Sequence, residues 1–589
     1  MNAIQTLLTE HLDIWTDADT EKKSGRGRSL GNAASVYGIR KLRELILELA
    51  VRGKLVPQDA NDEPASELLR RIQAEKSKLI AEGSIKKGKP LAPITEEEKS
   101  FDLPQGWVWA RNGFLFSLRK GRIPKILSED HIGLPYLDIE ALDRGVIRRY
   151  SNDDKCPQST DSDILVVCDG SRSGLVLNGK FGIIGSTLSI IDTPVFIQPF
   201  VRLIFKEGYE HLNSTMKGAA IPHLDTQKLV LEVIGLPPLA EQHRIVAKVD
   251  ELMELCDQLE TRHHNAAEAH EKLVSHLLAT LTQSPVRGEP VEPRPSTSSG
   301  RTEFEDNWQR IAAHFDTLFT TEASLDALKQ TLLQLAVMGK LVPQDPNDEP
   351  AIALLKRIQA EKARLIAEGK IKKDKPLPPI TEEEKPFELP QSWAWARIGE
   401  SVLSTEYGLS EKSFEVSEGV PVLKMGDIQD GKVILGGQKK VAHNVEGLPE
   451  LYLRAGDLLY NRTNSAELVG KTGIYDGLDG VYTFASYLIR IRCVDTLLSP
   501  RYLNFVMGTP LFRETQIEPH LKQQCGQANV NGTIMKNMIV SVPPFEAQKR
   551  IVAKVDELTA LCDQLKTRIT LANQLQQKLA DVVVEQAIA

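Results

Sequence analysis

The sequence predicts an α+β protein in which two variable α/β domains are separated by long antiparallel coiled-coil helices, with a pseudo-two-fold internal repeat. Three observations predict it: a block that occurs twice, a second repeated block with helical periodicity, and two dissimilar inserts between the blocks. Residues 53–111 and 339–397 agree at 46 of 59 positions, with a constant offset of 286. A chain of 589 residues exceeds the size of one hydrophobic core, so several domains are expected.

The second repeated block starts at Pro237 in the first half and at Pro543 in the second, an offset of 306. Apolar residues recur in it with the heptad spacing of a coiled-coil seam. The rows are Ile245, Leu252, Leu259, Ala266 and Leu273 beside Val249, Cys256, His263, His270 and Leu277, repeated as Ile551, Leu558, Leu565, Ala572 and Leu579 beside Val555, Cys562, Ile569, Gln576 and Val583. Two such helices pair most economically with each other, and an antiparallel pair places the variable domains at opposite ends.

The repeats divide the chain into two halves joined by a linker. The stretch TQSPVRGEPVEPRPSTSSGRTEFED is rich in Pro, Gly, Ser and Arg without apolar periodicity, which is typical of a flexible linker. The expected segments are an N-terminal conserved region at 1–111, a first variable domain at 112–236, a first long helix at 237–282, a low-complexity linker at 283–306, a second copy of the N-terminal region at 307–397, a second variable domain at 398–542 and a C-terminal long helix at 543–589.

The two inserts share little identity, but both contain short β-like runs between turns rich in Gly and Asp. DSDILVVCDGSRSG in the first insert parallels RAGDLLYNRTNS in the second. The inserts therefore resemble two diverged members of one domain type. A frame duplicated nearly verbatim around diverged domains suggests that the frame keeps one partner geometry while each insert reads something different.

Composition is that of an ordinary soluble protein, with 41% hydrophobic and 26% charged residues. No apolar run approaches the roughly 18 residues of a membrane span, and the N-terminus lacks the order of a secretory signal, so a cytoplasmic location is expected. The net charge of -8 does not favour a nucleic-acid partner, because phosphate neutralisation requires Lys and Arg. A local basic face needs only a few residues, so charge does not decide the matter.

The sequence contains no complete catalytic motif. SAELVGKT, which ends at Thr472, lacks a Gly of the phosphate-binding loop and is followed by a β-like run where a helix is needed. The Pro pairs before the long helices are better interpreted as helix starts, because Pro in the first turn loses no hydrogen bond. His263 and His270 have no further metal ligands nearby in the sequence. Core packing is expected for Trp107, Trp109, Trp393 and Trp395.

GKLVPQD, LPxxWxWAR and PPLAEQHRIVAKVDEL each occur in two copies around two dissimilar domains. This arrangement resembles the specificity subunit of type I restriction-modification enzymes over nearly the whole chain. The resemblance implies two target-recognition domains that each read one half of a bipartite DNA sequence, with the long helices fixing the spacer between the halves. It implies a non-catalytic subunit that is part of an adenine-specific methyltransferase and nuclease complex.

The resemblance also implies partners and cofactors. The partners are double-stranded DNA, two modification (methyltransferase) subunits and restriction (translocase and nuclease) subunits, and no membrane. S-adenosylmethionine, ATP and magnesium are expected on the partner subunits, and no cofactor or metal is expected on this chain.

Polar and basic residues in the turns of the inserts are the candidate DNA contacts, because Arg and Lys suit guanine edges or phosphates while Asn and Gln suit adenine edges. In the first domain they are Lys120, Arg122, Arg172, Ser173, Lys180 and His223. In the second they are Asn461, Arg462, Asn464, Lys471, Lys522, Gln523, Gln524 and Asn529. An alternative interpretation is a non-catalytic protein scaffold whose duplicated docking frames bind partners without any DNA reading.

Overall fold

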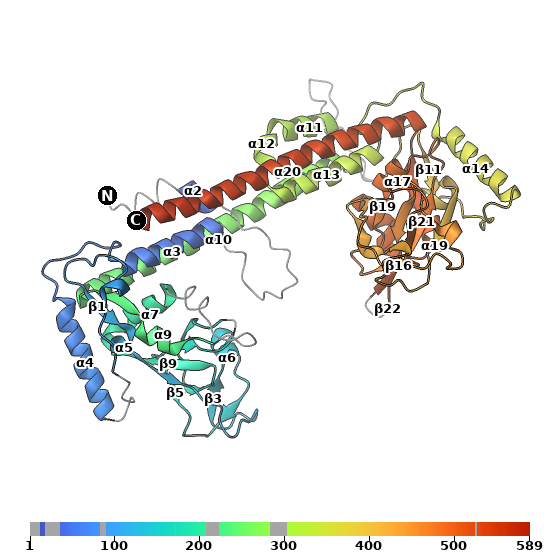
Figure 1. The fold of residues 1–589 in the computed structure, drawn as a ribbon. Coiled ribbons are helices and arrows are strands. Elements are labelled where there is room, and N and C mark those ends of the chain that lie inside the picture. The colour runs from blue at the N-terminus through green and yellow to red at the C-terminus, as the bar shows by residue number, and fades with distance from the viewer. Residues whose placement is uncertain are drawn as a thin grey trace. The chain divides into compact units, whose positions relative to one another are not determined.

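The computed structural model describes residues 12–17, 36–82, 90–170, 172–207, 223–282, 303–524 and 527–588. The chain forms two compact units: Met1–Ala266 with Ala572–Ala589, and Ala267–Leu571. Each unit combines a helical frame with one mixed domain of helices and strands (Figure 1). The predicted α+β class with two variable domains and long helices is therefore confirmed.

The frame of the first unit is built from helices and one strand pair. In the first unit α3 (Tyr37–Val51) runs antiparallel to the start of α10 (Leu239–Thr282). Arg43 of α3 bonds Asp257 at 2.6 Å and Glu260 at 2.8 Å, whereas Gln58, beyond the end of α3, bonds Glu241 in the first turn of α10 at 3.0 Å. The frame elements are α2 (Leu12–Asp17), α3 (Tyr37–Val51), α4 (Ala65–Ala81), β1 (Val108–Arg111), β10 (Val233–Leu236) and α10 (Leu239–Thr282).

The C-terminal end of the second long helix, α20 (Phe545–Ile588), completes the frame of the first unit. The Tyr37 hydroxyl donates to Asp581 at 2.8 Å, and Lys54 Nζ donates to the carbonyl of Ile588 at 2.8 Å. These contacts run in the same order along both helices, so this end of α20 is parallel to α3 and antiparallel to the start of α10. Val583, Val584 and Ile588 pack on the same core as the seam residues of α10.

The frame of the second unit has the same arrangement. Here the start of α20 takes the place of the start of α10, and the end of α10 takes the place of the end of α20. Helix α13 runs antiparallel to α20, since Lys566 bonds Asp326 at 2.9 Å and Thr570 bonds Glu322 at 2.7 Å, while Lys329 pairs with Asp563. The end of α10 joins them, where Val274, Leu278 and Leu281 are buried. The frame elements are α11 (Glu303–Ala313), α12 (Phe315–Leu318), α13 (Glu322–Val337), α14 (Ala351–Ala367), β11 (Ala394–Arg397) and β24 (Ile539–Val542).

The predicted heptad seam holds only in the first half of each long helix. Its N-terminal members are buried, among them Ile245 and Ile551 at 0% exposure. Further on the prediction is wrong: Leu273 and Leu579 are exposed, and their neighbours Val274 and Ala580 are buried instead. An α-helix has 3.6 residues per turn, so a straight helix drifts away from a strict seven-residue repeat. The buried face therefore shifts by one residue, from Leu273 to Val274 in α10 and from Leu579 to Ala580 in α20. In each unit the seam also packs against a short frame helix, so the two long helices do not pair alone.

A two-stranded antiparallel sheet joins each variable domain to its frame. β1 pairs with β10 and β11 pairs with β24 in the same register, so that Arg111 lies opposite Val233 and Arg397 opposite Ile539. The buried Arg111 guanidinium donates to the carbonyls of Ala92, Pro93 and Leu231 at 2.6 to 2.8 Å. It also forms a bidentate hydrogen bond to the Glu98 carboxylate at 2.9 Å. This hydrogen bond and the Thr95 backbone hold the pKa of Glu98 at about 2.

The first variable domain contains two four-stranded sheets. Their strand orders are β2-β9-β6-β7 and β4-β3-β8-β5, and β3 pairs with β8 in parallel. The elements are α5 (Asn112–Leu115), β2 (Ser117–Lys120), β3 (Leu134–Leu137), α6 (Ile139–Asp143), β4 (Tyr150–Ser151), β5 (Gln158–Ser159), β6 (Ile164–Val167), β7 (Val176–Asn178), β8 (Gly182–Ile184), β9 (Leu188–Asp192), α7 (Gln198–Glu207) and α9 (Thr226–Leu231).

The second variable domain follows the same topology with additions. Its largest sheet has the order β12-β21-β17-β19-β15-β14, and the smaller sheets are β16-β13-β20 and β18-β23-β22. The elements are α15 (Ile398–Ser401), β12 (Ser404–Tyr407), β13 (Val420–Leu423), β14 (Ile428–Gln429), β15 (Lys432–Val433), β16 (Lys440–Val441), α16 (Leu448–Leu451), β17 (Leu458–Asn461), β18 (Thr463–Asn464), β19 (Thr472–Ile474), β20 (Thr483–Phe484), β21 (Leu488–Arg492), α17 (Pro500–Met507), α18 (Pro510–Phe512), β22 (Lys522–Gln524), β23 (Gln527–Asn529) and α19 (Gly532–Asn537).

The structure also bears on the predictions for the tryptophans, the SAELVGKT stretch, the linker and membrane spans. Trp107 and Trp393 are buried, and the rings of Trp109 and Trp395 pack at a steep angle against those of Phe101 and Phe387, with centroids 4.9 Å apart. β19 follows Lys471, so the SAELVGKT stretch opens a strand and not a helix. Helix α11 begins at Glu303, inside the segment predicted as linker, while residues 283–302 lie outside the described residues. No helix in the described ranges is long and apolar enough to cross a bilayer.

Candidate nucleic-acid and partner interfaces

Strand register shows which positions of the two variable domains correspond. In the first domain β6 and β9 pair Val167 with Leu188, and in the second β17 and β21 pair Asn461 with Leu488. The next residues along the chain are Cys168 and Arg462, and each accepts a backbone hydrogen bond from the segment that leads into the last helix of its domain. The two domains therefore present the same strand end, next to the same connection.

In the first domain this strand end carries a charged cluster. The Asp169 carboxylate lies 3.3 Å from Lys120 Nζ and 2.7 Å from His223 Nδ1. Lys120 ends β2, and His223 forms an isolated β-bridge with Asp169. Beneath them Cys168 contacts Ser189 at 3.1 Å, and burial raises the pKa of the Cys168 thiol, so the thiol is neutral. Two of the predicted DNA contacts, Lys120 and His223, are thus brought together by a carboxylate.

In the second domain the same strand end carries a different cluster. The Arg462 guanidinium lies over the Tyr407 ring, 5.0 Å from its centroid, and its Nε donates to the carbonyl of Ser486 at 2.7 Å. Its Nη1 lies 3.5 Å from Asn529 Oδ1, which is also 3.4 Å from Thr463 Oγ1. Here too the structure brings together two predicted contacts, Arg462 and Asn529.

β22 extends this second cluster by backbone pairing. Its register places Lys522 opposite Asn529 and Gln523 opposite Ala528. The side chains of Lys522, Gln523 and Gln524 lie outside the described residues, so their role stays a prediction.

The other candidates lie elsewhere. Arg172 bonds Asp143 of α6 at 2.8 Å, which lowers the pKa of that carboxyl, and Lys180 Nζ lies 3.4 Å from the carbonyl of Ala141 in the same helix. Arg122 is exposed two residues after the end of β2. In the second domain Lys471 is exposed, and Asn464 Oδ1 accepts from the backbone of Ser465 at 2.8 Å.

Two candidates are not on the surface. Ser173 is 0% exposed and its hydroxyl donates to the carbonyl of Gly170, whereas Asn461 is 1% exposed and its amide donates to the carbonyl of Leu468. The expectation that both lie in solvent-facing turns is wrong. Both side chains fold back onto their own loops, and periodicity cannot show this.

Asp169, Tyr407 and Thr463 complete the two clusters and are not among the contacts predicted from sequence. The alignment of DILVVCDG with DLLYNRTN contains a signal for two of them, because it places Asp169 against Thr463 directly after a buried strand. Tyr407 has no such signal, since a lone Tyr at the end of a β-like run is unremarkable. Within the described ranges no group of three or more His, Cys, Asp or Glu side chains could hold a metal ion.

The frame carries a second kind of surface on the outer face of the long helices. We define the repeated stripe as five exposed positions that are identical in both copies and share one helix face by their spacing. They are Ala247, Glu251, Leu255, Gln258 and Arg262 on α10, and Ala553, Glu557, Leu561, Gln564 and Arg568 on α20. Leu255 and Leu561 are 43% and 48% exposed, although a Leu well inside a long amphipathic helix would normally face the core.

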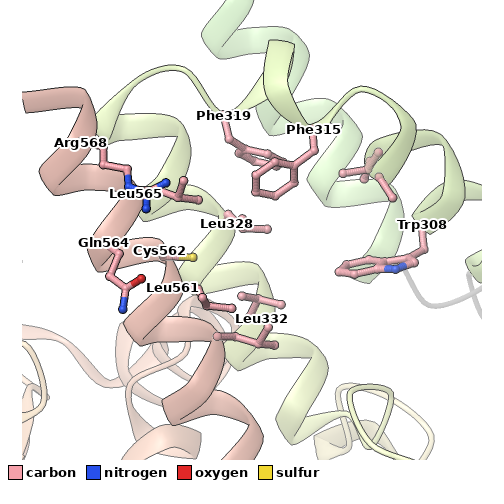
Figure 2. A pocket seen from close by; sticks show the side chains of 13 residues that line it. Trp308, Phe315, Phe319, Leu328, Leu332, Leu561, Cys562, Gln564, Leu565 and Arg568 are labelled. Atoms are coloured by element: carbon pink, nitrogen blue, oxygen red, sulfur yellow. The ribbon is translucent and has the colours of Figure 1, made fainter. Parts of the chain in front are cut away.

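In the second unit the repeated stripe borders an apolar pocket of about 460 Å³. Figure 2 shows Phe315 and Phe319 of the α12 region above Leu328, facing Cys562 and Leu565, with Trp308 at the opposite side and Arg568 at the rim. Exposed apolar surface of this kind is typical of a protein interaction site.

A family model described as the type I restriction modification DNA specificity domain matches residues 104–269 and 392–577. The type I restriction enzyme EcoEI specificity subunit of Escherichia coli is 36% identical over 611 residues, which cover 100% of both chains. The EcoAI specificity subunit of Escherichia coli is 38% identical over 617 residues, again 100% of both. A solved structure of the HsdS subunit from Thermoanaerobacter tengcongensis is 19% identical, covers 83% of this chain and 98% of that chain, and has a TM-score of 0.34.

Proposed function

Since this chain belongs to the family of type I restriction-modification DNA specificity subunits, we propose that it selects the DNA sequence for a methyltransferase and nuclease complex. Each variable domain reads one half of a bipartite target, and the chain itself is a non-catalytic subunit. The observation that carries this proposal is that two domains of one topology place different polar clusters at the same strand end, within frames that are nearly identical.

The different chemistry of the two clusters supports different half-sites. Lys120 presents an ammonium donor and His223 an imidazole, both held by a carboxylate, while the second domain offers an Arg462 guanidinium over a Tyr ring beside the amide of Asn529. Donors of the Lys and Arg type suit the N7 and O6 acceptors of guanine, and amides suit adenine. Two unrelated half-sites are therefore expected, not a palindrome.

The repeated stripe supports a proposal for the partners. Two copies of one surface fit two copies of one partner, and we assign them to two modification subunits, each docking on one stripe. Exposed positions of the neighbouring frame helices serve as a contrast: Ser66, Arg70 and Ser77 of α4 are replaced by Ile352, Lys356 and Ala363 in α14. Other exposed positions of the same helices are kept, among them Arg71, Gln73 and Ala74 as Arg357, Gln359 and Ala360, so the contrast is partial. Restriction subunits complete the proposed complex. The partner subunits carry S-adenosylmethionine, ATP and magnesium.

A DNA-binding selection tests the proposed function. The chain, assembled with its modification subunit, is used to select duplexes from a random pool at several salt concentrations. The selected DNA is expected to share two short sequences separated by a fixed gap, and the affinity is expected to fall as salt rises, because phosphate contacts release counterions. A stable assembly that selects no sequence would instead support a protein scaffold without DNA reading.

A further inference from the structure

The two variable domains hold three backbone positions in the same way but fill them with different side chains. We call them the paired positions: residues 120 and 407, residues 169 and 463, and residues 223 and 529. Lys120 and Tyr407 end the edge strands β2 and β12, opposite Ser189 and Ile489 of the neighbouring strands. Asp169 and Thr463 bridge to His223 and Asn529, respectively.

A glycine fixes the first paired position in each domain. A Cβ added at Gly121 would lie 2.2 Å from the carbonyl oxygen of Gly185, and one added at Gly408 would lie 2.2 Å from that of Phe484. Both distances are far below van der Waals contact, so only Gly allows the chain to pass this close. The residue just before it, Lys120 or Tyr407, is held at the same place in both domains.

A backbone hydrogen bond and a helix cap fix the other two positions. The amide of Leu224 donates to the carbonyl of Cys168 at 2.8 Å, and the amide of Val530 donates to that of Arg462 at 2.9 Å. The next residues, Asp225 and Asn531, cap the helices that follow. The connection therefore enters the strand end along one path in both domains, whatever side chains it carries.

The side chains at the paired positions face solvent in a defined arrangement. In the first domain the Asp169 side chain is only 18% exposed, whereas those of Lys120 and His223 are 59% and 56% exposed. A half-buried carboxylate thus orients an exposed ammonium and an exposed imidazole. In the second domain the exposed Tyr407 ring and the Ser486 carbonyl hold the guanidinium of Arg462, the residue before the paired Thr463.

We propose that the paired positions, together with Arg462 beside the paired Thr463, are the specificity-determining point of each domain and contact one base pair of its half-site. Lys120 and His223 in the first domain, and Arg462 and Asn529 in the second, contact the edge of that base pair. Asp169 and Tyr407 are positioning residues that act through them. This inference rests on the proposed function and adds to it the place where the two specificities diverge.

Two variants of adjacent residues on β2 test the proposal. Lys120→Met removes a donor of the cluster, and Arg119→Met removes a cation that pairs with Asp192 at 2.9 Å, away from the cluster. Neighbours on a strand point to opposite faces, so the pair is matched in charge and location. With each variant in the complex, methylated adenine is mapped in cellular DNA. Lys120→Met is expected to relax one base position of one half-motif, with discrimination at that position falling roughly 5- to 150-fold. Arg119→Met is expected to leave the motif unchanged.

The positioning role of Asp169 needs its own readout. Asp169→Asn is expected to relax the same base position as Lys120→Met, and the double variant is expected to be no worse than either single variant, because the residues act as a unit. Asp169→Glu keeps the carboxylate and is expected to restore most of the discrimination. In the second domain, Arg462→Met is expected to relax one position of the other half-motif only.

The outcomes separate this inference from the proposed function. If the unaltered chain directs a bipartite motif but Lys120→Met leaves every position intact, the inference is wrong and the proposed function stands. The inference also fails if Lys120→Met weakens methylation equally at all sequences, as a phosphate contact would. If the unaltered chain directs no motif, the proposed function itself fails.

Discussion

Replacing Arg111 with Ala is expected to open the strand pair that joins the first variable domain to its frame. The carbonyls of Ala92, Pro93 and Leu231 and the Glu98 carboxylate lose the Arg111 guanidinium, which is itself buried. The local free energy of opening should fall by about 3 to 5 kcal/mol, because a hydrogen bond from a charged donor contributes about 1.5 to 3 kcal/mol and Arg111 makes three to carbonyls. Hydrogen exchange of the backbone amides in β1 and β10 should then accelerate by roughly 100-fold or more, since about 1.4 kcal/mol corresponds to a factor of ten.

The internal repeat provides the control for this experiment. Arg397 makes equivalent bonds to the carbonyls of Pro378, Pro379 and Asn537 and to Glu384, so Arg397→Ala should accelerate exchange in β11 and β24 instead. Arg70→Ala, which removes a 73% exposed side chain, should change neither. If Arg111→Ala left exchange in β1 and β10 unchanged, the buried guanidinium would not be what holds the domain to the frame.

Replacing the exposed Leu of the repeated stripe with Glu is expected to prevent docking of the modification subunits. Leu255→Glu should cost the complex one modification subunit and Leu561→Glu the other, while the double variant should bind none and direct no methylation. A buried anchor at the centre of an interface is worth about 2 kcal/mol or more, so the affinity of each site should fall at least roughly 30-fold. Native mass spectrometry of the purified complexes gives the stoichiometry directly.

The matched control is another exposed Leu outside the repeated stripe. Leu478 lies in a loop of the second domain and is 77% exposed, so Leu478→Glu should leave the stoichiometry unchanged. Both stripe residues are exposed in the free chain, and their substitution should not disturb its folding. Full assembly of the double variant would show that the modification subunits dock on another surface.

The helical frame was largely predictable from sequence because its signal is periodic and occurs twice. Helix starts at the Pro pairs and the buried rows around Ile245 and Ile551 follow directly from spacing. The shift from Leu273 to Val274 was not predictable. It depends on the drift of a straight helix and on the short helices that pack beside it, and neither is visible in a list of apolar positions.

The candidate site was predictable only in part. Exposed cations and amides in turns could be chosen from sequence, and Lys120, His223, Arg462 and Asn529 do meet in clusters. Their partners Asp169 and Tyr407 were not found, because Asp169 meets Lys120 and His223, and Tyr407 meets Arg462, only when segments far apart in the chain come together. The burial of Ser173 and Asn461 was missed for a related reason: whether a turn residue faces solvent depends on the loop that closes over it.

The central claim is that each variable domain reads its own half of one bipartite sequence. The most direct measurement is a map of methylated adenine in cells that express the modification subunit with this chain, and with a chain in which residues 112–236 are exchanged for the corresponding domain of a related specificity subunit. We predict a bipartite motif with a fixed gap, in which the exchange changes one half and leaves the gap and the other half intact. A motif that changed in both halves, or did not change at all, would contradict the account.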